Sequence, residues 1–140
     1  MSPRSSRFDG MAAAMLIATA EDAAALLQPF FDGRPGDHVA VLHLDGAQRV
    51  IAVTPAAADA GEGGGLPVAA ILRAALRLGA DGIVVGYAHE QAEGELEPTE
   101  SERESTRRLA EAAAAMGVRL MDQLLFGAGE CRSYRALGLL

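Results

Sequence analysis

A continuous apolar run, GIVVGY at residues 82–87, constrains the fold of this chain more than any other feature. Strands that are buried on both faces read as continuous apolar runs, and such strands lie in the centre of α/β proteins. The segment before this run has apolar residues at helical spacing, namely Val68, Ile71, Leu72, Ala75 and Leu76. Pro67 suits the first position of that helix and Gly79 suits its end. The pattern therefore predicts a buried strand with an amphipathic helix packed beside it.

A second helix is expected after the strand. Thr99 is followed three residues later by Glu102, which is the spacing of a capping box, so a helix should begin there and end near Met116. The same kind of signal at Thr19 predicts a helix at roughly 20–30. Each signal is local, because it depends only on residues within one helical turn.

The remaining segments are rich in strand-forming residues. Two such runs on either side of Asp45-Gly46 read as a hairpin, and segments 118–127 and 131–140 look like two closing strands. The element order is then α-β-β-α-β-α-β-β, which indicates a single α/β domain with a mixed sheet and flanking helices. We expect its core to include Leu72, Leu76, Val84, Val85, Leu109 and Leu124.

Length, charge and cysteine content exclude several classes of protein. The 140 residues fit one compact domain, and no apolar run approaches the length of a membrane span, so a cytoplasmic protein is expected. Residues 1–16 read as an N-terminal extension, and their short, Ala-rich apolar run is a poor signal peptide. The net charge of −7, with no Lys, argues against nucleic-acid binding, which depends on neutralising phosphates. The single cysteine, Cys131, excludes a disulfide framework and is expected to be a small buried side chain.

The stretch from residue 89 to residue 102 carries the most specific motif. It reads His89-Glu90-Gln91-Ala92-Glu93-Gly94 and then Pro98-Thr99-Glu100-Ser101-Glu102. This resembles the pattern H-x-H-P-S-G-x-x-x-P-S-x-x-D of RadC-like JAB/MPN domains. The segments VLHLDGAQRVIA, LMDQLLFG and SYRALGLL are similar to other parts of that family. The resemblance covers residues 17–140 and implies a JAB/MPN fold with the layering of cytidine deaminases.

The resemblance also implies a chemistry. In active JAB/MPN metallopeptidases two His and one Asp hold zinc, an upstream Glu takes a proton from the metal-bound water, and the motif Ser stabilises the oxyanion. Catalytic zinc uses three protein ligands and keeps one open position. The metal lowers the pKa of its water, and a general base completes the activation.

This sequence departs from that pattern at almost every catalytic position. His89 matches the first ligand, but Gln91 replaces the second His and Glu102 replaces the Asp. Thr99 stands in place of the Ser, and the base is expected near Thr54, where no carboxylate occurs. We therefore expect neither catalytic residues nor a bound cofactor, with His89, Gln91 and Glu102 as vestigial zinc-ligand positions.

These substitutions favour a domain that has lost hydrolysis and acts as a binding or scaffold module, as a monomer or homodimer. Seven Glu and one Arg in residues 90–104 suggest an acidic surface for a protein partner with a basic surface, or for hard cations such as Ca²⁺ or Mg²⁺, which prefer oxygen ligands. The alternative is a divergent metal-dependent peptidase or isopeptidase that uses His89, Glu102 and an unrecognised third ligand. A role in DNA repair, by family analogy, is weaker because the chain is acidic. Of the other histidines, His43 should be packed or at an edge, and His38 at the surface.

Overall fold

The computed structural model describes residues 15–56, 65–89, 96–127 and 129–140. In these ranges the strands are β1 (His38–Leu44), β2 (Val50–Ala56), β3 (Gly82–Ala88), β4 (Arg119–Gly127) and β5 (Glu130–Ser133). The helices are α2 (Ala20–Leu27), the short 3-10 helix η1 (Gln28–Phe30), α3 (Val68–Leu78) and α4 (Glu100–Ala115). The predicted element order and the α/β fold class are confirmed.

The strands form one mixed sheet in the order β2-β1-β3-β4-β5. β1 pairs antiparallel with both β2 and β3, β3 pairs parallel with β4, and β4 pairs antiparallel with β5. A parallel pair needs a long crossover, and here α4 provides it. The connection from β3 to α4 therefore leaves the sheet at the carboxyl end of its central strand.

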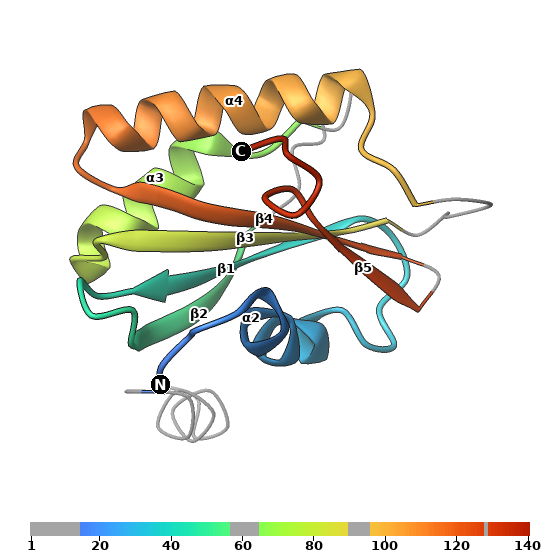
Figure 1. Cartoon of the computed structure of the whole chain (residues 1–140), viewed down its shortest axis with the longest axis horizontal. Coiled ribbons are helices and arrows are strands. Elements are labelled where there is room, and N and C mark those ends of the chain that lie inside the picture. Colours follow the sequence, from blue (N-terminus) through green and yellow to red (C-terminus); the bar gives the residue numbers. More distant parts are fainter. Residues whose placement is uncertain (1–14, 57–64, 90–95, 128) are drawn as a thin grey trace.

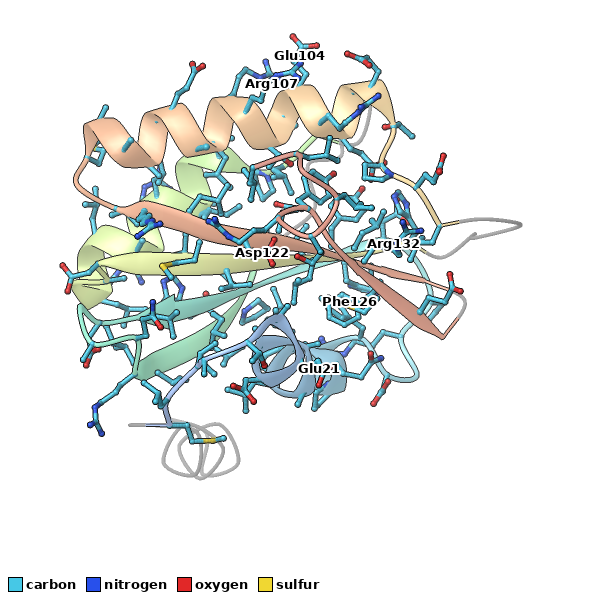
Figure 2. All side chains as sticks on the ribbon, viewed as in Figure 1. Glu21, Glu104, Arg107, Asp122, Phe126 and Arg132 are labelled. Atoms are coloured by element: carbon cyan, nitrogen blue, oxygen red, sulfur yellow. The ribbon has the colours of Figure 1, made fainter. Side chains whose placement is uncertain are left out.

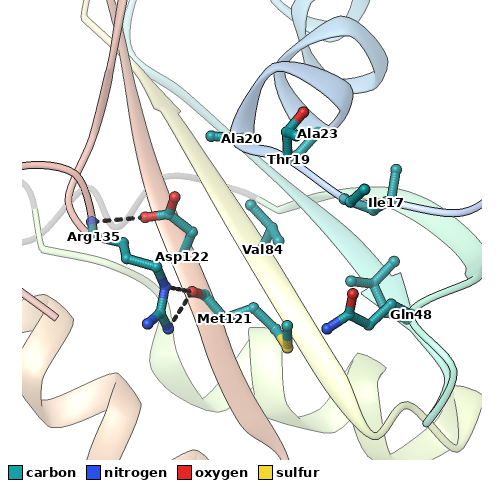
Figure 3. A pocket seen from close by; sticks show the side chains of 11 residues that line it. Ile17, Thr19, Ala20, Ala23, Gln48, Val84, Met121, Asp122 and Arg135 are labelled. Atoms are coloured by element: carbon teal, nitrogen blue, oxygen red, sulfur yellow. Dashed lines mark hydrogen bonds between the residues drawn. The ribbon is translucent and has the colours of Figure 1, made fainter.

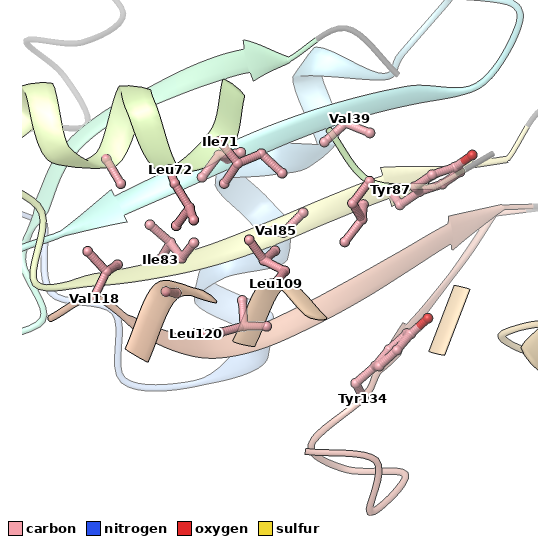
Figure 4. Close-up of a cluster of buried hydrophobic side chains, with 14 of the residues drawn as sticks. Val39, Ile71, Leu72, Ile83, Val85, Tyr87, Leu109, Val118, Leu120 and Tyr134 are labelled. Atoms are coloured by element: carbon pink, nitrogen blue, oxygen red, sulfur yellow. The ribbon is translucent and has the colours of Figure 1, made fainter. Parts of the chain in front are cut away.

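Helices cover both faces of the sheet (Figure 1). α3 and α4 lie on one face and α2 lies on the other. All seven residues of β3 are buried, as its apolar run predicts. The larger core cluster lies under α3 and α4 (Figure 4) and includes Ile71, Leu72, Ile83, Val85, Leu109 and Tyr134. The second cluster lies under α2 and includes Leu27, Phe31, Leu42, Val84, Leu124 and Phe126.

The local helix signals act as predicted. Thr19 with Asp22 and Thr99 with Glu102 both form complete capping boxes, in which each side chain bonds the other residue's backbone N–H. Gly79 ends α3 in the left-handed conformation at φ 68°, which glycine adopts without steric cost. Pro67 is the residue that precedes α3, one position earlier than predicted.

The hairpin between β1 and β2 is also confirmed. The Asp45 side chain accepts hydrogen bonds from the backbone N–H groups of Ala47 and Arg49 at 2.8 and 2.9 Å, and these bonds order the turn. Just before α2, residues 15–17 lie against the start of β2, because Val50 N donates to Met15 O at 2.9 Å. The rest of the predicted extension, residues 1–14, lies outside the described residues.

Three predictions about single segments are wrong. Leu76 is 47% exposed rather than in the core, because it follows the buried Ala75 by about 100° around α3 and lies beyond the edge of the stripe. The last strand ends at Ser133 instead of continuing to residue 140, since the buried Tyr134 turns the chain inward and residues 134–138 form turns. Cys131 is exposed, because β5 is the edge strand of the sheet.

The other predicted core residues, Leu72, Val84, Val85, Leu109 and Leu124, are buried. Within the described ranges, no helix combines the length and the apolar character that crossing a bilayer requires.

Candidate functional site

The motif histidine lies where β3 leaves the sheet. His89 directly follows β3, and its backbone N–H donates to Phe126 O on β4 at 3.0 Å. Glu102 lies in the first turn of α4, where the crossover returns toward the sheet. Open α/β sheets place their functional groups at the carboxyl ends of the strands, and these two side chains meet there.

His89 and Glu102 bond directly to each other. The distance from His89 Nε2 to Glu102 Oε2 is 2.5 Å, which is short for a hydrogen bond between a ring nitrogen and a carboxylate. The glutamate is nearly inaccessible, with 7% of its surface exposed, and the histidine side chain is 24% exposed. The contact therefore ties the end of β3 to the start of α4 in a place that water reaches poorly.

The second oxygen of Glu102 is also engaged. Oε1 accepts the backbone N–H of Thr99 at 2.8 Å, while Thr99 Oγ1 accepts the backbone N–H of Glu102 at 3.1 Å. Burial by itself would raise the pKa of Glu102, but the hydrogen bonds from His89 and Thr99 outweigh it and leave the pKa below its ordinary value. Both oxygens of this carboxylate thus serve the fold.

Two further residues surround the histidine ring. Asp37 Oδ1 lies 3.9 Å from His89 Nδ1, so that each ring nitrogen faces a carboxylate. Tyr87 packs against the ring with centroids 4.8 Å apart, and its hydroxyl donates to Asp37 Oδ2 at 3.3 Å. The hydrogen bond to Glu102 raises the pKa of His89, and the charge of Asp37 raises it further. Burial lowers this pKa, but the raising effects together are larger. The site therefore favours a protonated imidazole.

Asp37 and Tyr87 were not predicted as site residues. Asp37 lies 52 positions before His89 in the sequence and reaches it only because β1 pairs with β3. Tyr87 is two residues before His89 and therefore on the same face of the extended chain, which is a signal that the sequence does contain.

Zinc, the metal that the motif implies, does not fit the described residues. Zinc lies about 2.0–2.2 Å from each nitrogen or oxygen ligand, so two tetrahedral ligand atoms are roughly 3.3 Å apart. His89 Nε2 and Glu102 Oε2 are closer than that, and a metal ligand histidine must be deprotonated. No group of three His, Cys, Asp or Glu side chains suited to a metal ion occurs in the part of the chain that the structure describes.

The remaining motif positions are not all brought together. Thr99 is exposed and caps α4, as its predicted capping role requires. Gln91 lies outside the described residues. Thr54 lies opposite Val41, which itself lies opposite Val85, whereas His89 is four residues further on. From strand spacing and rise, Thr54 is roughly 16 Å from His89. Its hydroxyl instead bonds His43 Nε2 at 2.9 Å.

The other two histidines form hydrogen bonds to other residues. His43 is fully buried, which agrees with its prediction as a packed residue. His38 is partly exposed at the start of β1, and its ring bonds Pro35 O at 2.8 Å.

The surface hollows among the described residues include two that lie beside the sheet. One of about 270 Å³ has His89 in its lining, together with residues of β4, β5 and the segment after α2, among them Phe31, Pro35, Phe126 and Glu130. The other, of about 160 Å³, lies beside the start of α2 (Figure 3). There Asp122 accepts the backbone N–H of Arg135 and the Arg135 guanidinium donates to Met121 O, so both charged groups stabilise the sheet edge.

The His89–Glu102 contact predicts a measurable coupling. In a double-mutant cycle with His89→Gln and Glu102→Gln, we expect the two side chains to stabilise each other by about 1–2 kcal/mol, because the pair is largely excluded from water. Urea unfolding at pH 6 measures each free energy of unfolding. The exposed pair Arg103 and Glu100, 3.2 Å apart, is the control and should give under about 1 kcal/mol. Equal coupling in the two cycles would contradict the structural role of the contact.

Comparison with known proteins identifies a family and several relatives that this chain resembles. Residues 17–139 match the RadC-like JAB domain. The chain is 34% identical over 70 residues to a UPF0758 protein of Symbiobacterium thermophilum, an alignment that covers 50% of this chain and 29% of that protein. It is 32% identical over 99 residues to one of Acidithiobacillus ferrooxidans, covering 71% and 43%.

A UPF0758 protein of Xanthomonas axonopodis pv. citri is 32% identical over 101 residues, which cover 72% of this chain and 44% of that protein. The chain thus spans less than half the length of these curated relatives.

Proposed function

From the fact that this chain belongs to the RadC-like JAB domain family, we propose that it is a member without hydrolase activity, whose former metal site has become a structural contact. The domain then acts as a binding or scaffold module. One observation carries the proposal. The two motif side chains that remain able to hold a metal, His89 and Glu102, bond to each other, and the other oxygen of Glu102 caps α4.

Loss of chemistry with retention of fold has a simple physical basis, because the core and the site are separate requirements. His89 and Glu102 are not members of the apolar clusters, and of the residues around the His89 ring Tyr87 alone belongs to one among the described residues. In the active pattern the carboxylate holds zinc, whereas here it forms a hydrogen bond and a helix cap. The proton shared with His89 takes the place of the metal charge between the two groups.

Metal content tests the proposal directly. Protein purified without added metal should contain well under one zinc per chain, because the described site offers two mutually bonded ligands. Elemental analysis of the wild type and of His89→Ala makes the measurement, with a peptide or isopeptide hydrolysis assay beside it. Stoichiometric zinc that disappears in His89→Ala would overturn the proposal in favour of a divergent metal-dependent peptidase.

The proposed partner is a protein with a basic surface. Glu97, Glu100 and Glu104 are exposed at and just before the start of α4, within the acidic stretch 90–104. Figure 2 shows Glu104 on the outer side of α4, and Glu21 lies on the opposite face of the domain. Clustered charge of one sign raises the local concentration of an oppositely charged partner, and salt screens this effect.

A labelled arginine-rich peptide is a suitable probe for this surface. Replacing Glu97, Glu100 and Glu104 with Gln should weaken its binding roughly tenfold at low salt, since each exposed ion pair contributes about 0.2–1 kcal/mol. Fluorescence anisotropy at low and at high salt gives the affinities. A control variant with Glu21, Asp32 and Glu111 neutralised has the same net charge. If both variants bind the peptide equally, the acidic stretch is not the interaction surface.

A further inference from the structure

A third hollow, of about 210 Å³, lies between the start of α4, the end of β5 and the C-terminal segment. It is separate from the His89 site. Its lining consists of Glu97, Pro98, Arg103, Arg132, Leu137 and Leu139. Two guanidinium groups and one carboxylate therefore share the hollow with three apolar side chains.

Arg103 is incompletely paired in this position. Its Nη2 donates to Glu100 at 3.2 Å, but Glu100 is 78% exposed, and such exposed pairs contribute little. Its Nε is buried and has no hydrogen-bond acceptor among the described residues. A guanidinium has five N–H donors, so the two Nη groups of Arg103 keep donors that a carboxylate in the hollow can use.

Arg132 is held in place by the backbone. Its Nη1 donates to Leu96 O at 3.2 Å, and Leu96 is a buried residue of the core. This bond orients the guanidinium from β5 toward the segment that leads into α4. A guanidinium has five N–H donors in a rigid fork, so one bond to the backbone leaves donors that can reach a ligand.

We propose that this hollow binds a carboxylate attached to a short aliphatic group, either a free aliphatic acid or the C-terminal residue of a peptide. The two guanidinium forks match the planar carboxylate. Pro98, Leu137 and Leu139 cover the aliphatic part, and the partly exposed Leu137 loses contact with water on binding. The carboxylate of Glu97 disfavours a doubly charged anion such as phosphate. This inference does not depend on whether the domain hydrolyses anything.

N-acetyl-leucine is the probe, followed by shifts of backbone amide signals in two-dimensional NMR. We expect binding at about millimolar concentration, as for a ligand of this size. The amide of N-acetyl-leucine, which lacks the carboxylate, should bind at least about tenfold more weakly. A hydrogen bond to a charged group contributes enough free energy for a loss of affinity of that size or larger. A peptide with a free C-terminal leucine that binds more tightly than N-acetyl-leucine identifies a peptide as the source, and equal affinity identifies a free acid.

Arg103→Gln and Arg132→Gln should each weaken binding about tenfold or more. Arg107→Gln is the matched control, because Arg107 is exposed on the outer side of α4 (Figure 2). Leu137→Glu places a negative charge at the hollow from a partly exposed position and should abolish binding without loss of the fold. The proposal is overturned if the wild type does not bind, if the amide or phosphate binds as tightly, or if Leu137→Glu binds like the wild type.

Discussion

Zinc affinity should rise roughly a hundredfold or more when Gln91→His and Glu102→Asp are combined. The binding free energy of structural zinc is about 10–16 kcal/mol for four ligands, and each added ligand contributes part of that free energy. The two changes restore the His-His-Asp spacing of the family motif and leave the fourth position of zinc for water. The shorter side chain that Glu102→Asp introduces also withdraws from His89, which frees the ring nitrogen for the metal. Isothermal titration of zinc into both proteins measures the difference.

The fold should tolerate this exchange. Asp22 performs in α2 the capping role that Glu102 performs in α4, and it forms a complete box with Thr19. The matched control combines Gln91→His with Glu100→Asp, which makes the same chemical changes but moves an exposed carboxylate. If the control and the restored variant bind zinc equally, the alignment of residues 89–102 with the motif is wrong.

Hydrolysis should remain poor in the restored variant. General-base catalysis contributes typically about 10²–10⁴-fold. The position at which the motif predicts the base, near Thr54, has no carboxylate and does not adjoin His89. Thr54→Glu should not supply the missing base, since the β1–β2 and β1–β3 registers hold this position far along the sheet from His89.

Acid should destabilise the protein through His43. This side chain of β1 is fully buried, its Nε2 bonds Thr54 Oγ1, and its Nδ1 has no partner among the described residues. Desolvation lowers the pKa of His43 to about 4. The unfolded chain therefore binds a proton more readily than the folded chain between that value and the ordinary histidine pKa of about 6.5.

The sign of the effect follows from this order of pKa values. The contribution of His43 is complete above about pH 6.5 and is lost as the pH falls toward 4, which amounts to about 3 kcal/mol in full. Urea unfolding between pH 7 and pH 4 measures it. His89 acts in the opposite direction, because its raised pKa stabilises the fold at low pH and that contribution is lost as the pH rises through its folded-state pKa.

His43→Gln separates the two histidines. Glutamine does not titrate and retains an amide that can bond Thr54, so the variant keeps the His89 contribution and loses that of His43. The free energy of unfolding of the wild type should decline more steeply below pH 6.5 than that of the variant. Parallel pH profiles for the two proteins would show that His43 is not the titrating group.

Features that depend on near neighbours could be predicted from the sequence alone. The apolar run of β3 can be buried only between two helical layers, and the two capping boxes start their helices through bonds that span three residues. The hairpin at Asp45 and the end of α3 at Gly79 belong to the same class. The motif of residues 89–102 identified the family for the same reason, since its spacing is a local pattern.

The roles of the motif residues depend instead on contacts between distant segments. Glu102 was predicted both as a helix cap and as a vestigial ligand position. The tertiary structure brings it to His89, 13 residues away, so that the same carboxylate caps α4 and bonds the histidine. Asp37 reaches the same ring through the register of β1 on β3. The exposure of Leu76 and the inward turn at Tyr134 likewise depend on which surface the neighbouring element covers. Composition and local spacing do not predict these contacts, because the contacts form only when segments far apart in the sequence pack on the same face of the sheet.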